Sequence, residues 1–182
     1  GIDFLAFSGH KMFASTGLGV LWVNKNIHQD MHSFIVGGGS DLKTPKKMPQ
    51  LLEGGTPNIG GIISLGSAID FINSVGIENI HQYLSDLTMY AIERLREIEK
   101  IAFLPGPGAC ENCLAGEGIV SFKIKDIASS DIGFYLDHHN ICVRAGYHCI
   151  GSSDYQDSIR LSFQVYNTKQ EIDTLIDVLK MV

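Results

Sequence analysis

Lys11 is the first residue whose type and setting suggest chemistry. It closes the run Ser8-Gly9-His10-Lys11, directly after an apolar segment at residues 3–7 that predicts a buried strand. We expect the lysine at a sheet edge in partly desolvated surroundings, which favour a neutral amine able to react with an aldehyde. Ser8 and His10 add hydrogen-bonding groups that suit a phosphate. Taken alone, the same run is more often a surface lysine at the end of a strand.

A glycine-rich run at residues 54–58 contains Thr56 and precedes a long apolar segment at residues 59–75. We expect that segment to form a largely buried helix, with Gly76 as its C-cap. Free N–H groups near a helix start, together with a threonine hydroxyl, are typical of phosphate sites. Alone, the run is more often a plain helix-start turn with Asn58 as the N-cap.

The run from Arg144 to Cys149 follows a strand expected at residues 141–144. Alternation along that strand puts Cys142 and Arg144 on one face. Cys149 then lies beside His148 in a loop with glycine and serine residues. A partly exposed thiol next to histidine is suited to act as a thiolate, although an incidental cysteine is the alternative.

Arg160 lies in a second expected strand, at residues 158–163. Ile159, Leu161 and Phe163 share one face of this strand, so Arg160 emerges on the other face. A guanidinium group there can bind a carboxylate through two parallel hydrogen bonds. The alternative is an ordinary solvated arginine.

The remaining cysteines, Cys110 and Cys113, have CxxC spacing. A zinc site would need two further ligands, and Cys142 and Cys149 qualify only by number, because six residues separate them. We therefore expect no metal site. Because we see no signal-peptide pattern in these residues, we expect reduced cysteines.

Hydrophobic periodicity predicts the other elements. They are a helix at residues 80–98, a strand at 119–124, a helix near 130–139 and a final helix after the capping-box pair Thr168 and Glu171. The C-terminal part therefore predicts helices packed on a small sheet. The first 58 residues supply only two strands and long loops, and they begin in an apolar run without Met, so we expect a fragment or a processed chain.

Composition excludes several classes of function. The 182 residues include 14 Lys and Arg against 20 Asp and Glu, a net charge of −6, which argues against nucleic-acid binding by bulk charge. No apolar run is long enough to span a membrane, and the first residues lack the pattern of a signal peptide. We therefore expect a cytoplasmic protein with no membrane or nucleic-acid partner.

Several motifs, in order, resemble a known family. They are FSGHK, GLGVLWV, GGGS, EGGTPNIGG, RAGYHC and IRLSFQVYNT, and together they span nearly the whole chain. The sequence resembles the class V aminotransferase-like cysteine desulfurases, closest to the Suf-type group and its selenocysteine lyase relatives. The resemblance implies an α/β protein of the fold-type I class of pyridoxal-phosphate-dependent transferases, of which this chain matches the second half. Residues 1–75 would be the remnant of the cofactor-binding large domain with a connecting helix, and residues 76–182 the small C-terminal α/β domain.

The resemblance implies a cofactor role for four residues. Lys11 would bind pyridoxal 5'-phosphate covalently, and Ser8 and His10 would contact its phosphate. Thr56 would reach the phosphate bound by a neighbouring protomer, so the complete protein is expected to be a homodimer. The groups that stack on the pyridoxal ring and pair with its nitrogen belong to the half that this chain does not match, so we expect the chain alone to be inactive.

The resemblance implies substrate roles for four others. Arg160, with Arg144 and His148 nearby, would bind the substrate, Arg160 through its carboxylate. Cys149 would attack the sulfur of L-cysteine, which leaves a persulfide on the protein and releases L-alanine. His148 and Arg144 are expected to favour the thiolate form of Cys149.

The function implied is therefore that of a pyridoxal-phosphate-dependent cysteine desulfurase. It would supply sulfur for iron–sulfur cluster assembly, in which case a sulfur-acceptor protein is a further partner. Two alternatives stay open: a selenocysteine lyase or other class V lyase that uses the same Lys11 and Arg160, and a non-catalytic α/β interaction module.

Overall fold

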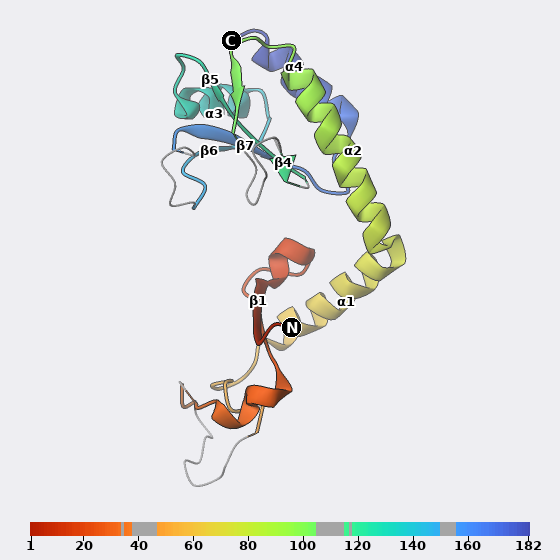
Figure 1. The fold of residues 1–182 in the computed structure, drawn as a ribbon, viewed down its shortest axis with the longest axis vertical. Helices are drawn as coiled ribbons and strands as arrows, with labels where there is room; N and C mark the ends of the chain where they lie inside the picture. Colours follow the sequence, from red (N-terminus) through yellow and green to blue (C-terminus); the bar gives the residue numbers. More distant parts are fainter. Residues whose placement is uncertain (34, 38–46, 105–114, 117, 150–155) are drawn as a thin grey trace. The chain divides into compact units, whose positions relative to one another are not determined.

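The computed structural model describes residues 1–33, 35–37, 47–104, 115–116, 118–149 and 156–182. The chain divides into two compact units, Gly1–Val75 and Gly76–Val182 (Figure 1). Each unit is described by itself. The identification of the first unit as the remnant of a cofactor-binding domain stays a prediction.

The first unit is built on an antiparallel pair of strands and one long helix. Its elements are β1 (Phe4–Ser8), the 3-10 helices η1 (Gly9–Met12) and η2 (Lys25–Asp30), β2 (Gly19–Val23) and α1 (Ile59–Val75). Phe4 pairs with Val23 and Ser8 with Gly19, so η1 and the turn after it join the two strands. The predicted strands and the predicted helix at residues 59–75 are confirmed.

The predicted burial of β1 and α1 is wrong for this chain. Phe4 is 53% exposed, Trp22 47% and Ile63 66%. Within α1 only Gly61 and Ala68 are buried. The physical reason is the small number of elements, because two strands and one helix cannot cover all of each other's apolar faces.

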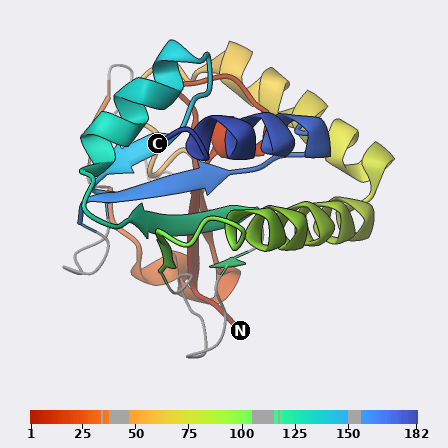
Figure 2. The same cartoon turned by 90° about the horizontal axis from the view of Figure 1, so that it is seen from above.

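The second unit is an antiparallel sheet with three helices (Figure 2). Its strands are β3 (Ile101–Phe103), β4 (Ala115–Gly116), β5 (Ile119–Ile124), β6 (Arg144–Gly146) and β7 (Ser158–Ser162). Its helices are α2 (Ile77–Leu95), α3 (Ser129–His138) and α4 (Lys169–Leu179). The strand order is β3-β5-β7-β6, and β4 pairs with β5, so β5 and β7 are the central strands and β6 is an edge strand.

The core of this unit follows from alternation on β5 and β7. Val120 and Phe122 are fully buried on β5, and Ile159 and Leu161 are buried on β7. The three helices add their apolar faces to the same cluster, chiefly Leu87, Ala91, Leu95, Ile132, Leu136, Ile172, Ile176 and Leu179. Residues between these on the strands, Arg160 among them, therefore emerge on the opposite face.

Polar contacts hold α4 in place. The predicted capping box is confirmed, since Thr168 Oγ1 accepts the Glu171 N–H at 3.3 Å and Glu171 Oε2 accepts the Thr168 N–H at 2.8 Å. Asp173 on α4 accepts the Tyr90 hydroxyl at 2.6 Å and the Arg94 Nε–H at 3.0 Å, both from α2. These contacts join the two longest helices of the unit along one side.

The structure differs from the prediction at the start of β6 and at two short strands. Strand β6 begins at Arg144 and not at residue 141, because the Ile141 N–H closes the end of α3 on the Leu136 carbonyl at 2.9 Å and residues 141–143 form the connection. Strands β3 and β4 were not predicted, since they have three and two residues and carry too little pattern.

Gly76 is the N-cap of α2, directly after the last residue of α1, and its φ of 89° is a conformation that favours glycine. The sequence predicted this glycine only as the end of the preceding helix. Within the described residues no single helix is long and apolar enough to cross a membrane; α1 and α2 meet that test only when counted together as one broken segment.

Helix α3 approaches β6 closely at one glycine. A Cβ atom added at Gly133 would lie 2.9 Å from the Cβ of Ala145, which is closer than carbon atoms normally pack. Ala145 stands between Arg144 and Gly146 in β6. Gly133 therefore allows the helix to press on the strand that carries Arg144.

We expect Gly133→Ala to lower the free energy of unfolding of the second unit by about 1–3 kcal/mol, the usual cost of overpacking. The steric cost should exceed the roughly 1 kcal/mol that alanine contributes to a helix relative to glycine. Urea denaturation followed by circular dichroism measures the change. In a double-mutant cycle, Ala145→Gly should recover part of the loss; a Gly133→Ala variant as stable as the parent would contradict the close approach.

Candidate functional site

The candidate residues form two groups, one in each unit. The first is the lysine turn, which we define as residues Ser8–Lys11 together with Thr56. The second is the arginine–cysteine group, which we define as Arg144, His148, Cys149 and Arg160. The two groups are described separately.

Tight packing at Gly9 fixes the backbone of the lysine turn. Gly9 is buried, its N–H donates to the Leu18 carbonyl at 2.9 Å, and a Cβ there would lie 3.3 Å from the side chains of Ala14 and Leu18. The chain turns into η1 at this point, and the Phe13 ring stands edge-on to Phe71 of α1 with centroids 5.3 Å apart. The turn is thereby fixed at both ends.

The turn presents its polar side chains outward. Ser8 is half-buried, whereas His10 and Lys11 are exposed. A shallow hollow of about 410 Å³ lies over residues 6–8 and 19–21 and includes Ser8. The partial desolvation expected for Lys11 is therefore not supplied by its own unit, because the same lack of covering elements that exposes β1 also exposes the turn.

Thr56 is exposed and lies just before α1. The turn interpretation of this segment is confirmed, since Asn58 Oδ1 accepts the Gly61 N–H at 3.0 Å. Asn58 also donates from Nδ2 to the Gly17 carbonyl at 3.2 Å, a contact that the sequence did not indicate. Asn58 thus ties the start of α1 to the loop between η1 and β2.

The chemistry of the lysine turn fits pyridoxal phosphate. An exposed amine at Lys11 is the group that bonds to an aldehyde. The Ser8 hydroxyl and the His10 ring can hydrogen-bond a phosphate, and a Cβ at Gly9 would press on the side chains of Ala14 and Leu18 in the same turn. Lys11, Ser8 and His10 thus stay the predicted cofactor-binding residues, and Thr56 stays the residue predicted to reach the phosphate of a neighbouring protomer.

The arginine–cysteine group rests on the pairing of two strands. Arg144 of β6 stands directly opposite Arg160 of β7 in the antiparallel register, so both side chains emerge on the face away from Ile159 and Leu161. Like charges directly opposite each other are unfavourable. Arg160 Nε is buried and has no hydrogen-bond partner among the described residues. The pair is therefore suited to an anion such as a carboxylate.

Cys149 lies within reach of one of these arginines. Its Sγ accepts a hydrogen bond from Arg144 Nη2 at 3.3 Å, and the thiol is exposed and free of any disulfide. The same guanidinium donates to the Tyr147 carbonyl from Nε at 3.4 Å and from Nη2 at 3.3 Å. Cys149 itself has a φ of 60°, the left-handed conformation that is uncommon outside glycine. The sulfur therefore stands beside a fixed positive charge.

His148 has a different place from the one predicted. It is 95% buried, with a relative exposure of 5%, and its Nε2 lies 2.8 Å from the Ser158 hydroxyl oxygen. Burial, followed by the charges of Arg160 and Arg144, lowers the pKa of His148 below its usual 6.5. The ring forms its hydrogen bond with Ser158, so a contribution of His148 to the thiolate form of Cys149 stays a prediction. The hydrogen bond to Sγ comes from Arg144 instead.

Ser158 was missed by sequence reasoning. It is fully buried and pairs with Gly146 across β6 and β7. Asp157, just before it, accepts the Ser129 N–H at the start of α3 at 2.7 Å. A signal was available, because a serine at the start of an apolar strand is a buried polar group that needs a partner.

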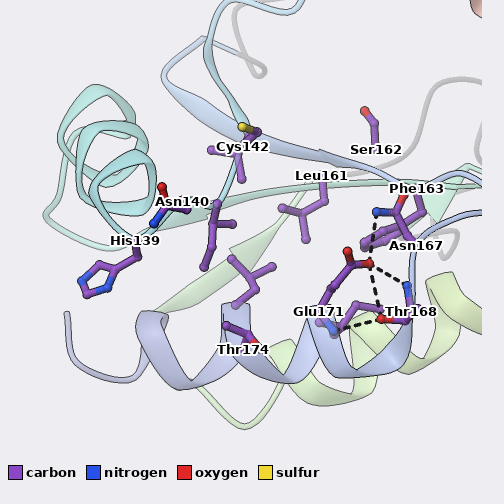
Figure 3. A pocket seen from close by; sticks show the side chains of 14 residues that line it. His139, Asn140, Cys142, Leu161, Ser162, Phe163, Asn167, Thr168, Glu171 and Thr174 are labelled. Carbon is purple, nitrogen blue, oxygen red and sulfur yellow. Dashed lines mark hydrogen bonds between the residues drawn. The ribbon is translucent and has the colours of Figure 1, made fainter.

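A second hollow, of about 350 Å³, lies in the same unit (Figure 3). It is lined by the connection at residues 139–143, the end of β7 and the first turns of α4. Cys142 lines it with an exposed free thiol, whereas Arg144, Cys149 and Arg160 do not. Cys142 lies before β6 and therefore does not share a strand with Arg144 as predicted, although the predicted alternation holds, since both residues are exposed while Ile141 and Val143 pack against the core. Cys110 and Cys113 lie outside the described residues, and the described part of the chain contains no cluster of three metal-ligating side chains.

The family model described as aminotransferase class-V matches residues 1–175. The chain belongs to the class-V aminotransferase family. The predicted resemblance is thereby confirmed.

Individual relatives are named cysteine desulfurases. A probable cysteine desulfurase of Halalkalibacterium halodurans is 40% identical over 96% of this chain and 44% of its own length. One from Streptomyces coelicolor is 38% identical over 99% of this chain and 44% of its own length. Among solved structures, a cysteine desulfurase from Thermococcus onnurineus has a TM-score of 0.88 at 32% identity, over 98% of this chain and 46% of that chain. The predicted α/β fold class is confirmed by this likeness.

The chain spans about half the length of these relatives. The residues that we single out are therefore those of one half only. Substrates, partners and the activity of the whole protein belong to the proposal below.

The depressed pKa of His148 predicts a dependence of stability on pH. Because the unfolded chain binds a proton near pH 6.5 and the folded His148 does so only at lower pH, acid favours the unfolded state. Stability of the second unit should therefore fall as the pH drops from about 7.5 to about 5.5, as measured by urea midpoints.

His148→Gln keeps a hydrogen-bonding side chain and removes this titration, so it should lose less stability over the same pH interval. His138→Gln, at the exposed end of α3, controls for the number of histidines. An acid loss in His148→Gln equal to that of the parent would show that His148 is not the group responsible.

Proposed function

We propose that the complete protein is a pyridoxal-phosphate-dependent cysteine desulfurase. The observation that carries the proposal is the exposed Cys149 thiol at 3.3 Å from Arg144, next to the opposed pair Arg144 and Arg160. A free thiol beside two opposed arginines on one face of the sheet suits a substrate that bears both a carboxylate and a sulfur atom. The named relatives support the same reaction class.

In the proposed reaction the residues of the second unit bind and attack the substrate. Arg160, with its unpartnered Nε–H, binds the carboxylate of L-cysteine, and Arg144 adds a second positive charge. The Cys149 thiolate attacks the substrate sulfur, so a sulfur–sulfur bond forms and the carbon–sulfur bond breaks. The electron pair of the broken bond goes to the substrate carbon, which takes up a proton, and the products are L-alanine and a persulfide on Cys149.

The lysine turn provides the cofactor side of the proposal. Lys11 would bind pyridoxal phosphate covalently, with Ser8 and His10 on its phosphate. When bound, the cofactor supplies the electron sink that permits bond cleavage next to the α-carbon of the amino-acid substrate. Thr56 is assigned to the phosphate of a neighbouring protomer, which makes the complete protein a homodimer.

The fate of the persulfide sulfur defines the further partner. A persulfide on an exposed cysteine is open to attack by the thiol of an acceptor protein, and supply of sulfur for iron–sulfur clusters is the proposed use. Because Cys149 is exposed, the acceptor thiol does not have to enter a deep cavity to reach the persulfide.

Cys149→Ser is expected to abolish sulfur release from L-cysteine in the complete protein, because a hydroxyl cannot form the persulfide. Binding of cofactor and substrate should persist, since Lys11 and Arg160 are untouched. Alanine production and persulfide labelling, followed by peptide mass spectrometry, measure the loss.

Cys142→Ser is the matched control, because Cys142 is also an exposed free thiol and lies outside the arginine–cysteine group. It should retain turnover. If Cys149→Ser still turns over cysteine, Cys149 is not the nucleophile and the proposed function fails. Turnover of selenocysteine alone in that variant would favour the selenocysteine lyase alternative as an additional activity.

Lys11→Ala is expected to remove the visible absorbance of covalently bound pyridoxal phosphate, because no amine then remains in the lysine turn. Borohydride reduction followed by mass spectrometry should find the cofactor on the peptide that contains Lys11 in the parent. Lys25→Ala, an exposed lysine of η2 in the same unit, should keep the absorbance. Cofactor fixed to another lysine in the parent would refute the assignment.

A further inference from the structure

His148 is held by contacts that point away from the Cys149 thiol. The exposed and buried residues alternate at this point, since Tyr147 is 65% exposed, His148 only 5% and Cys149 exposed. The His148 ring therefore enters the interior between its two exposed neighbours. Its hydrogen-bond partner there is Ser158, at 2.8 Å.

Arg144 holds the segment 147–149 from its exposed side. Its guanidinium donates to the Tyr147 carbonyl and to the Cys149 sulfur, the residues on either side of His148. Ser158 pairs with Gly146 in the same two-strand register that sets Arg144 opposite Arg160. The segment 147–149 is thus fixed on one side by Arg144 and on the other by Ser158 through His148.

The His148 ring has no alternative anchor in the described structure. Its Nδ1 is buried without a hydrogen-bond partner among the described residues, so the contact of Nε2 with Ser158 is the bond that the structure shows for the ring. Loss of the Ser158 hydroxyl would leave a buried polar ring poorly satisfied, which is costly. The ring would then tend to leave its site and carry the neighbouring Cys149 with it.

We propose that His148 and Ser158 are positioning residues that hold the Cys149 sulfur beside the Arg144 guanidinium. His148 acts as a neutral anchor and not as an acid, base or charge partner of the thiol. The proposal deepens the proposed function, since it concerns the thiol assigned there to sulfur transfer. It also accounts for the φ of 60° at Cys149, because a residue held from both sides can keep an uncommon backbone conformation.

The test compares two alkylating reagents that differ in charge. Iodoacetate is an anion and iodoacetamide is neutral. The rate with iodoacetate divided by the rate with iodoacetamide therefore reports the positive charge near a sulfur. The fraction of thiolate and the accessibility of the sulfur affect both rates and cancel in the ratio. Peptide mass spectrometry resolves Cys149 from Cys142 in the same protein. Two unit charges 4 Å apart in water change a rate roughly fivefold, so we expect the ratio at Cys149 to exceed that at Cys142 by about this factor.

Ser158→Ala and His148→Leu should both lower the ratio at Cys149 toward that at Cys142, and Arg144→Gln should do the same. His148→Gln, which can still donate to Ser158, should keep most of it. Ser162→Ala is the matched control, because this serine is exposed on the same strand. It should leave the ratio unchanged.

Two results would overturn the proposal. One is an unchanged ratio at Cys149 in Ser158→Ala and His148→Leu while Arg144→Gln lowers it, which would mean that Arg144 alone positions the sulfur. The other is a ratio at Cys149 equal to that at Cys142 in the parent. If His148→Leu unfolds the unit, as circular dichroism would show, Ser158→Ala and its conservative partner Ser158→Thr decide the question. The alkylation assay does not depend on turnover. A parent protein that releases no sulfur from L-cysteine would therefore refute the proposed function without affecting this test.

Discussion

The antiparallel pairing of β6 with β7 fixes the two arginines of the arginine–cysteine group and Ser158, the hydrogen-bond partner of His148. The register sets Arg144 opposite Arg160 and Gly146 opposite Ser158. Because side chains alternate along a strand, a shift of one residue would send the arginines into the core and the apolar residues of β7 out of it. The burial of Ile159 and Leu161 against the helices therefore also keeps the two guanidinium groups on the outer face.

Burial and the two neighbouring arginines disfavour the protonated form of His148. Two guanidinium groups already oppose each other across the strands, and a third positive charge in the interior would be strongly unfavourable. Burial and the two arginines lower the pKa of His148, and the ring forms a hydrogen bond with Ser158. The charge that faces the Cys149 sulfur is consequently that of Arg144. A histidine next to a cysteine in sequence is thus not its chemical partner in space.

The two units differ in how completely the helices and strands within each unit cover one another's apolar faces. In the second unit, three helices and the sheet share one buried cluster, and the polar contacts of α4 complete it. In the first unit, the strands and α1 leave large apolar residues exposed, and Lys11 is exposed with them. The lysine turn is nevertheless well defined, because Gly9, Leu18 and the edge-on rings of Phe13 and Phe71 fix it locally. The first unit therefore provides the local geometry of the lysine turn but does not provide the desolvation of Lys11.

The sequence determined the features that depend on near neighbours. The helix at residues 59–75, the strand at residues 119–124 and the capping box of Thr168 with Glu171 follow from periodicity and spacing within a few residues. The alternation that turns Arg160 away from the core is of the same kind. The motifs, read in order, were also sufficient to indicate the family. Only the tertiary structure decided which residues meet across strands, because the opposition of Arg144 to Arg160 and the contact of His148 with Ser158 depend on a register that no local pattern encodes. Burial was likewise decided at that level, since the exposure of an apolar strand or helix depends on how many other elements are available to cover it.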